Sequence, residues 1–373
     1  MTRLVVLHAI LMEDALACLR KTTPTLNLTY PADAFEHFES LRSALRPWWQ
    51  WQHLRVQHGQ AYMEVEDAWH WHFESAFNVS TRAKLNDSLS GLFGPYIPLF
   101  VSWYRATRHS QLDPMLVATL RRVLRPSVAY ITLVVADEGI SGWSRKAQRN
   151  RSNEIRLQED YPNLLVLSGG GYGHIPYPPL KNPQPLSPGR KEVARRKLLA
   201  SFVGNVKHGG VFGGPSLRNR LKHIAWGVAA ELNASVSFTQ GPDWQQVMVS
   251  SRASFAPRGQ GRSTFLLAEI VNMGLIPIHV YSDTPWVPYA DLFSSFGYVT
   301  NLSGVPDVLR RVNALGPRTH ARMERRAAEL SGTHFSLSGV LEQIGRWMIG
   351  GTNASDLRCQ KLPRTPRDLI GGL

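Results

Sequence analysis

The amino-acid sequence predicts an α/β protein with two domains, each built on a doubly wound parallel sheet. Three observations lead to this prediction. Residues 198–348 alternate short apolar strands with amphipathic helices. Residues 128–136 are a run of small and β-branched apolar residues, and residues 163–168 are a second apolar run, which is typical of strands buried in a parallel sheet. Between these parts, residues 175–190 contain six prolines, which exclude a helix or a central strand and indicate an interdomain linker.

The first 110 residues show no clear periodicity, but they contain six tryptophans. The groups Trp48–Trp51 and Trp69–Trp71 fit two interpretations, packing in a core or a platform on which sugar rings stack. The next element is an amphipathic helix over residues 115–126, with arginines near its end.

Polar residues follow both predicted strands of the first domain. Residues 128–136 end in Asp137 and Glu138, which places carboxylates at the carboxyl end of a strand, the edge where open α/β sheets bind ligands. Residues 163–168 run into the glycines of 169–173 and then His174. Such a glycine run permits a tight turn or a close approach of the backbone to a ligand.

The second domain has the more regular pattern. Strands are predicted over residues 198–203, 235–239, 253–257, 275–280 and 297–300, and helices over 216–232, 244–249, 263–273, 303–315, 318–331 and 336–348. These elements give an N-terminal domain over residues 1–175, a linker over 176–192, a second domain over 193–350 and a tail over 351–373.

Composition narrows the class of protein. The 373 residues are 43% hydrophobic and 19% charged, which fits a globular protein and excludes a disordered one. The formal net charge of +14 favours anionic partners, although short basic clusters such as residues 318–326 are typical of solvated helix faces. No stretch has the length and apolarity of a membrane span.

Three residue types indicate whether the protein binds a metal and in which cellular compartment it lies. They are cysteine, histidine and asparagine. Cys18 and Cys359 are the two cysteines, and neither they nor the histidines have the spacing of a metal site, so no metal is expected. The sequence alone does not decide whether Cys18 and Cys359 form a disulfide. Seven asparagines stand in Asn-x-Ser/Thr, where chance gives roughly two, which indicates a glycosylated protein of the secretory lumen. They are Asn27, Asn78, Asn86, Asn150, Asn233, Asn301 and Asn353.

The most informative segment is residues 255–289, which predicts a strand, a glycine-rich basic loop, a helix and a second strand. The loop contains Arg258, Gly259 and Arg262, and Ser263 and Thr264 open the helix. Backbone N–H groups at a helix N-terminus, glycines and guanidinium groups together bind phosphate. The arginines would stabilise a departing diphosphate, and Glu269 lies on the helix where it can accept hydrogen bonds from sugar hydroxyls.

This segment resembles the exostosin family of glycosyltransferases in the string from Pro257 to Phe265, in Glu269, and in Asp283-x-x-Trp286. Two flanking parts agree, residues 197–204 with Arg218, and residues 137–139 with 169–176. The match covers roughly residues 125–315. The resemblance implies a GT-B fold, in which two Rossmann-like domains with parallel sheets face a central cleft and the C-terminal domain binds a nucleotide sugar without an obligatory metal or cofactor.

The implied reaction is hexosyl or glycuronosyl transfer from a nucleoside-diphosphate sugar, such as a UDP-sugar, to a glycan or glycoprotein in the Golgi lumen. A carboxylate of the N-terminal domain would act as general base. The candidate bases are Asp137, Glu138 and His174. The candidate substrate-binding residues are Gly204, Arg218, Arg258, Gly259, Arg262, Ser263, Thr264, Glu269 and Asp283.

Two other functions fit parts of the sequence. The positive charge suits a non-catalytic protein that binds acidic polysaccharide or nucleic acid, but base-stacking aromatics between the basic clusters are missing, so no nucleic acid is expected. A transferase-like partner that assists another enzyme is the third possibility.

Overall fold

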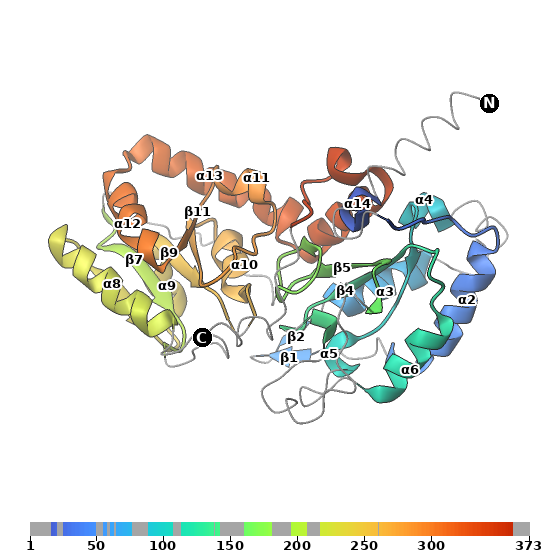
Figure 1. Ribbon diagram of the computed structural model, residues 1–373. Helices are drawn as coiled ribbons and strands as arrows, with labels where there is room; N and C mark the ends of the chain where they lie inside the picture. The colour runs from blue at the N-terminus through green and yellow to red at the C-terminus, as the bar shows by residue number, and fades with distance from the viewer. Residues whose placement is uncertain are drawn as a thin grey trace. The chain divides into compact units, whose positions relative to one another are not determined.

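The computed structural model describes residues 16–20, 25–49, 55–57, 60–62, 65–76, 89–106, 113–137, 139–141, 160–180, 195–206, 217–259 and 261–360. The chain forms two compact units (Figure 1). Unit 1 comprises Met1–Tyr177 and Leu341–Leu373, and unit 2 comprises Pro178–Val340. Each unit contains an open sheet whose described strands are all parallel, which confirms the prediction of two parallel-sheet α/β domains.

The sheet of unit 2 has the strand order β11-β10-β9-β7-β8. Its strands are β7 (Leu198–Val203), β8 (Val236–Thr239), β9 (Ser251–Pro257), β10 (Pro277–Tyr281) and β11 (Tyr298–Asn301). The chain passes from β7 outward to β8 and then returns to the other side of β7 to form β9, so the order reverses between β7 and β9. The carboxyl ends of two strands at such a reversal are the usual ligand site of open α/β sheets.

Helices cover both faces of this sheet. They are α8 (Leu217–Glu231), α9 (Trp244–Val249), α10 (Phe265–Asn272), α11 (Ala290–Phe293), α12 (Val305–Ala314) and α13 (Pro317–His334). Helices α8 and α12 lie side by side on one face, and α10 lies on the other (Figure 1). The apolar sides of α8 and α12 enclose a core with Phe202, Phe255 and Ile278 of the strands. Every predicted element of residues 198–335 is present, with ends that differ by three residues at most.

The sheet of unit 1 has the order β3-β4-β5-β6, which follows the sequence without a reversal among the described strands. Its strands are β3 (Ile97–Pro98), β4 (Tyr130–Val134), β5 (Leu164–Ser168) and β6 (Ile175–Pro176). A separate antiparallel pair consists of β1 (Arg55–Gln57) and β2 (Gln60–Tyr62). The helical elements are α2 (Ala34–Leu45), η1 (Arg46–Trp48), α3 (Val65–Ala76), α4 (Leu89–Phe93), α5 (Trp103–Ala106), α6 (Pro114–Val123) and η4 (Gly139–Ser141).

Helix α14 (Leu337–Ala354) begins in unit 2, and most of it belongs to unit 1. Trp347 is fully buried there and stacks on Tyr96 with ring centroids 5.9 Å apart. Downstream, Cys359 forms a disulfide with Cys18, and the Gln360 N–H donates to the His174 carbonyl at 2.8 Å. The units therefore divide near residue 340, whereas the sequence suggested a domain end at 350 followed by a tail.

The predicted linker over 176–192 begins inside the sheet. Pro176 ends the edge strand β6, a position at which proline is tolerated because its missing N–H faces away from the ladder. Tyr177 is fully buried, and residues 181–194 lie outside the described residues.

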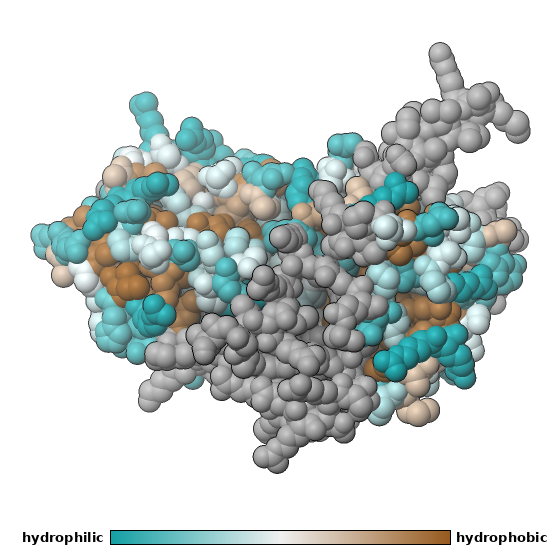
Figure 2. All heavy atoms as spheres, viewed as in Figure 1, coloured by the Kyte–Doolittle hydropathy of each residue, from teal (hydrophilic) through white to brown (hydrophobic). Residues whose placement is uncertain are grey.

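The surface agrees with the interpretation of the basic cluster at residues 318–326. Hydrophilic side chains lie along α13 (Figure 2), and Arg318, Arg322 and Arg325 are exposed. By contrast, Arg196 is buried and its guanidinium pairs with both oxygens of Glu324, at 2.6 and 3.0 Å. Of the helices that the structure describes, none combines the length and apolarity that crossing a membrane requires.

Candidate functional site

The first candidate site lies at the carboxyl ends of β7 and β9, where the strand order of unit 2 reverses. Arg218, the second residue of α8, donates to the carbonyl of Asn205 after β7 at 3.2 Å and to that of Arg258 after β9 at 3.4 Å. Its guanidinium carbon lies 5.4 Å from the centre of the Phe202 ring. Arg218 thus connects both loops of the reversal, and it is half-buried.

Gly204 shapes the same loop. Its φ of +149° is strained for other residues, and an added Cβ would lie 3.0 Å from the Phe202 ring. Its N–H donates to the Thr239 carbonyl at 2.8 Å, so this group holds β7 to β8 and is not directed at a ligand.

Arg258 and Arg262 converge on a single carboxylate, that of Asp283 after β10. Arg258 Nη1 lies 3.0 Å from Asp283 Oδ1, and Arg262 Nε and Nη2 lie 2.7 and 2.6 Å from Oδ2. The arginine side chains are 5% and 1% exposed, and that of Asp283 is 18% exposed. Burial opposes the ionisation of Asp283, but the two guanidinium groups outweigh it and hold the pKa of this carboxyl below its usual value.

The loop between these arginines is also bonded internally. Arg258 Nε donates to the Gly261 carbonyl at 2.9 Å, and the Gly259 N–H donates to the Ser263 carbonyl at 2.9 Å. The helix begins at Phe265, two residues later than expected, because Thr264 is the N-cap and its hydroxyl accepts from the Leu266 N–H at 3.3 Å. The sequence placed all these groups around a phosphate, whereas in the structure an internal carboxylate holds the two arginines.

Three polar side-chain atoms of this region are buried and have no hydrogen-bond partner among the described residues. They are Arg218 Nε, Ser263 Oγ and His279 Nε2. Unsatisfied buried polar atoms are rare in folded proteins and are often completed by a ligand or water. His279 of β10 is held through Nδ1, 3.0 Å from the Ala256 carbonyl, and burial lowers its pKa to about 4.

Net charge gives this region its binding preference. Arg218, Arg258, Arg262 and Asp283 together contribute three guanidinium groups and one carboxylate, which favours an anionic ligand. Burial lowers the pKa of Arg218, but a guanidinium stays protonated in proteins. Glu269 lies half-buried in the second turn of α10.

The second candidate site lies at the carboxyl ends of β4 and β5 in unit 1. Asp137 follows β4 and is half-buried, and Glu138 lies outside the described residues. The loops after the two strands are in close contact. A Cβ added to Gly170 would meet the Ala136 carbonyl and the Asp137 backbone, and one added to Gly139 would meet the Tyr172 carbonyl. The glycine run of residues 169–173 therefore serves a close approach of backbone to backbone.

His174 is buried, and its Nδ1 accepts from the Val166 N–H at 3.0 Å. This bond requires the tautomer with the proton on Nε2. Burial lowers the pKa of His174 to about 3, so the ring is neutral near pH 7 and has no free lone pair to accept a proton. These contacts favour a structural role over that of general base.

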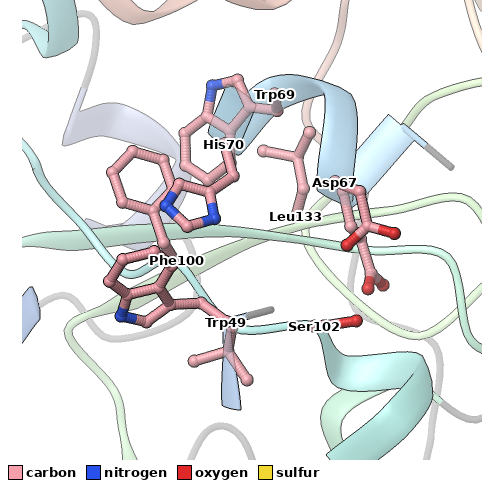
Figure 3. Close-up of a pocket in the computed structure, with 9 residues that line it drawn as sticks. Trp49, Asp67, Trp69, His70, Phe100, Ser102 and Leu133 are labelled. Atoms are coloured by element: carbon pink, nitrogen blue, oxygen red, sulfur yellow. The ribbon is translucent and has the colours of Figure 1, made fainter. Parts of the chain in front are cut away.

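A pocket near the same sheet edge includes Trp49 and Trp69, from the two tryptophan groups for which the sequence left core packing and a sugar platform open, but its other lining residues were not predicted. Its walls come from Trp49 directly after η1, from α3 and β4, and from the residues after β3 (Figure 3). Its lining residues are Trp49, Glu66, Asp67, Trp69, His70, Phe100, Val101, Ser102 and Leu133. Four sequence-distant segments contribute, so beyond these tryptophans the available signal was a short run of acidic and aromatic residues from Glu66 to His70.

Comparisons with known proteins give little further guidance. No family model matches the sequence, and no curated protein does. The structure "Crystal Structure of TarM" aligns with 10% identity over 60% of this chain and 51% of that one, with a TM-score of 0.37. The structure of WaaG, described as a glycosyltransferase involved in lipopolysaccharide biosynthesis, aligns with 15% identity over 59% and 62% of the chains, with a TM-score of 0.34. The chain thus spans less than two thirds of either structure, and likeness of this degree assigns neither a family nor an activity.

Proposed function

We propose that the protein is a glycosyltransferase that uses a nucleoside-diphosphate sugar, such as a UDP-sugar, and that unit 2 binds this donor. The observation that carries the proposal is Arg218, which bridges the loops after β7 and β9 at the reversal of strand order and has an unsatisfied buried Nε. Open α/β sheets bind their ligands at this position. The same proposal includes the GT-B arrangement of the two units and a relationship to the exostosin family.

In this proposal the arginines have different tasks. Arg218 contacts the diphosphate, and Ser263 Oγ supplies a further hydrogen bond. Arg258 and Arg262, held by Asp283, fix the shape of the loop and add positive charge. Glu269 accepts hydrogen bonds from sugar hydroxyls. The positive charge stabilises the diphosphate when its bond to the sugar breaks.

The reaction exchanges one C–O bond for another and transfers one proton. The oxygen of an acceptor hydroxyl attacks the anomeric carbon of the donor sugar, the bond from this carbon to the phosphate oxygen breaks, and the nucleoside diphosphate leaves. We assign the hydroxyl proton to Asp137, which follows β4, with Glu138 as the alternative. An Asp137→Asn variant is expected to lose at least a hundredfold in turnover with donor affinity unchanged, and full activity would remove Asp137 from this role.

We also propose that the protein matures in the secretory pathway, in the Golgi lumen. The Cys18–Cys359 disulfide is of the kind that forms in oxidising compartments. The described sequon asparagines, Asn27, Asn233, Asn301 and Asn353, are all exposed. Treatment of protein from a eukaryotic secretory host with peptide N-glycosidase is expected to raise its electrophoretic mobility, and unchanged mobility would contradict this assignment.

The activity is tested by a panel of UDP- and GDP-sugars. Thermal unfolding reports binding, because a ligand that binds the folded state alone raises the midpoint. Release of nucleoside diphosphate in the presence of a mixture of glycan acceptors reports transfer. We expect one donor to raise the midpoint and to be turned over, with activity retained in EDTA because no metal is required.

The alternative functions give different results. No shift with any nucleotide sugar, together with salt-sensitive binding to heparin or nucleic acid, is the result expected of a basic binding protein. A shift without turnover under any acceptor condition is expected of a transferase-like partner that assists another enzyme.

A further inference from the structure

The pocket of unit 1 lies at the carboxyl edge of the parallel sheet. Phe100 and Ser102 follow β3, and Leu133 belongs to β4, while the remaining walls come from Trp49 and the first turns of α3. Its enclosed part has room for about one water-sized group. A whole sugar ring does not fit inside it, but one hydroxyl group does.

One wall of the pocket is acidic. Glu66 and Asp67 are 5% and 7% exposed, which is rare for carboxylates. Glu66 is anchored to the sheet, because its Oε1 accepts from the Val135 N–H at 2.5 Å. The carboxylate of Asp67 and the hydroxyl of Ser102 lie on the same side of the pocket (Figure 3).

The opposite wall is aromatic. Trp49, Trp69, His70 and Phe100 lie together on that side (Figure 3). His70 stacks on Phe100 with ring centroids 4.5 Å apart and an interplanar angle of 14°, and Trp49 meets His70 edge-on at 4.6 Å. The Trp49 indole is fixed by the bond from its Nε1 to the Arg42 carbonyl at 2.9 Å. Trp49 is half-buried, so part of its surface is available to a ligand.

These two walls select one chemical class. Carboxylates accept hydrogen bonds from hydroxyl groups, and aromatic surfaces pack against the C–H groups of a sugar ring. The same carboxylates repel phosphate, sulfate and uronate groups, although the chain as a whole is strongly basic. The pocket thus differs from the arginine site of unit 2 in the charged side chains that line it.

We propose that this pocket binds the end of a neutral glycan, with one sugar hydroxyl donating to Asp67 inside the pocket and the ring against Trp49. Its role as the acceptor subsite rests on the proposed function, but the binding itself does not. The class of acceptor that follows is a glycan whose terminal sugar carries no acidic group.

The test measures sugar binding without any donor. The probes are the methyl glycosides of galactose, glucose, mannose and xylose, with methyl glucuronide as the acidic comparison, followed by saturation-transfer NMR and tryptophan fluorescence. We expect at least one neutral glycoside to bind and methyl glucuronide to bind at least tenfold more weakly. Asp67→Asn is expected to weaken binding about tenfold, because a hydrogen bond to a charged group is lost.

Two further variants separate the pocket from general effects on folding. Trp49→Phe is expected to weaken binding, whereas Trp71→Ala, which removes a 49% exposed tryptophan of the same helix α3 outside the pocket, is expected to leave it unchanged. Circular dichroism verifies that each variant is folded. Absence of binding by every neutral glycoside, or binding that folded Asp67→Asn retains in full, would overturn the proposal. If no glycoside binds but the same preparation turns over a donor, the pocket proposal fails and the transferase proposal stands. If a glycoside binds but no donor does, the pocket proposal stands and the transferase proposal fails.

Discussion

The two sheets differ in topology and in the charge at their carboxyl edges. In unit 2 the strand order reverses between β7 and β9, and arginines gather at the reversal. In unit 1 the described strands follow sequence order, and the carboxyl edge carries buried carboxylates and aromatic rings. Two sheets of the same class therefore carry different charged side chains at their carboxyl edges, and the proposed donor and acceptor sites rest on this difference.

The largest expected effect concerns the covalent bond in unit 1. The Cys18–Cys359 disulfide closes a loop with a sequence separation of 341 residues, and unit 2 contains no counterpart among its described residues. Replacing both cysteines by alanine is expected to lower the free energy of unfolding of unit 1 by about 4 kcal/mol. Hydrogen exchange should accelerate in β3, β4 and α14 and stay unchanged in β9 and β10. Equal acceleration in both units would show that their stabilities are not separate.

The second prediction concerns the internal carboxylate of unit 2. Asp283→Ala leaves the buried guanidinium groups of Arg258 and Arg262 without their carboxylate, and is expected to cost about 3 kcal/mol in urea unfolding. The matched control is Asp307→Ala, whose 73% exposed side chain pairs with Arg310 at 3.3 Å and should cost under about 1 kcal/mol. Similar losses for the two variants would mean that the Asp283 cluster contributes no more than a surface ion pair.

The third prediction concerns pH, and it is tested by two of the buried histidines, His174 of unit 1 and His279 of unit 2. The folded-state pKa of His279 is about 4 and that of His174 about 3, below the unfolded value of about 6.5. Below pH 6.5 the unfolded chain takes up protons that the folded chain does not, so stability falls with falling pH. From pH 7 to pH 5 we expect each histidine to account for a loss of about 2 kcal/mol.

Single substitutions show which histidine causes the loss of unfolding free energy in each unit. His279→Phe should flatten the dependence of unfolding free energy on pH for unit 2, and His174→Phe should do so for unit 1. A slope identical to that of the unsubstituted protein would contradict the buried, neutral state of the replaced histidine.

The difference between the two units also determines how much of each can be predicted from the sequence. In unit 2 the strands are long enough for their apolar runs to be recognised, and the loop, helix and strand of residues 255–289 are contiguous, so Arg258, Arg262 and Asp283 were all selected. The pairing of the two arginines with Asp283 was not predicted. It depends on neighbouring parallel strands that bring together residues 21 and 25 positions apart in the sequence. In unit 1, β3 and β6 have two residues each, too few for any periodicity. The pocket around Asp67 combines segments between residue 49 and residue 133, and no local sequence pattern predicts that they come together.

The most direct test of the account is the affinity for UDP of two arginine variants on the same helix. Arg218 bridges the loops at the strand reversal, whereas Arg220, two residues further along α8, is exposed. Isothermal titration calorimetry at one salt concentration should show that Arg218→Ala binds UDP at least tenfold more weakly, because charge-assisted hydrogen bonds to phosphate are lost. Arg220→Ala should bind as the unsubstituted protein does. Equal affinity of folded Arg218→Ala and the unsubstituted protein would contradict the assignment of the donor site to this edge of unit 2.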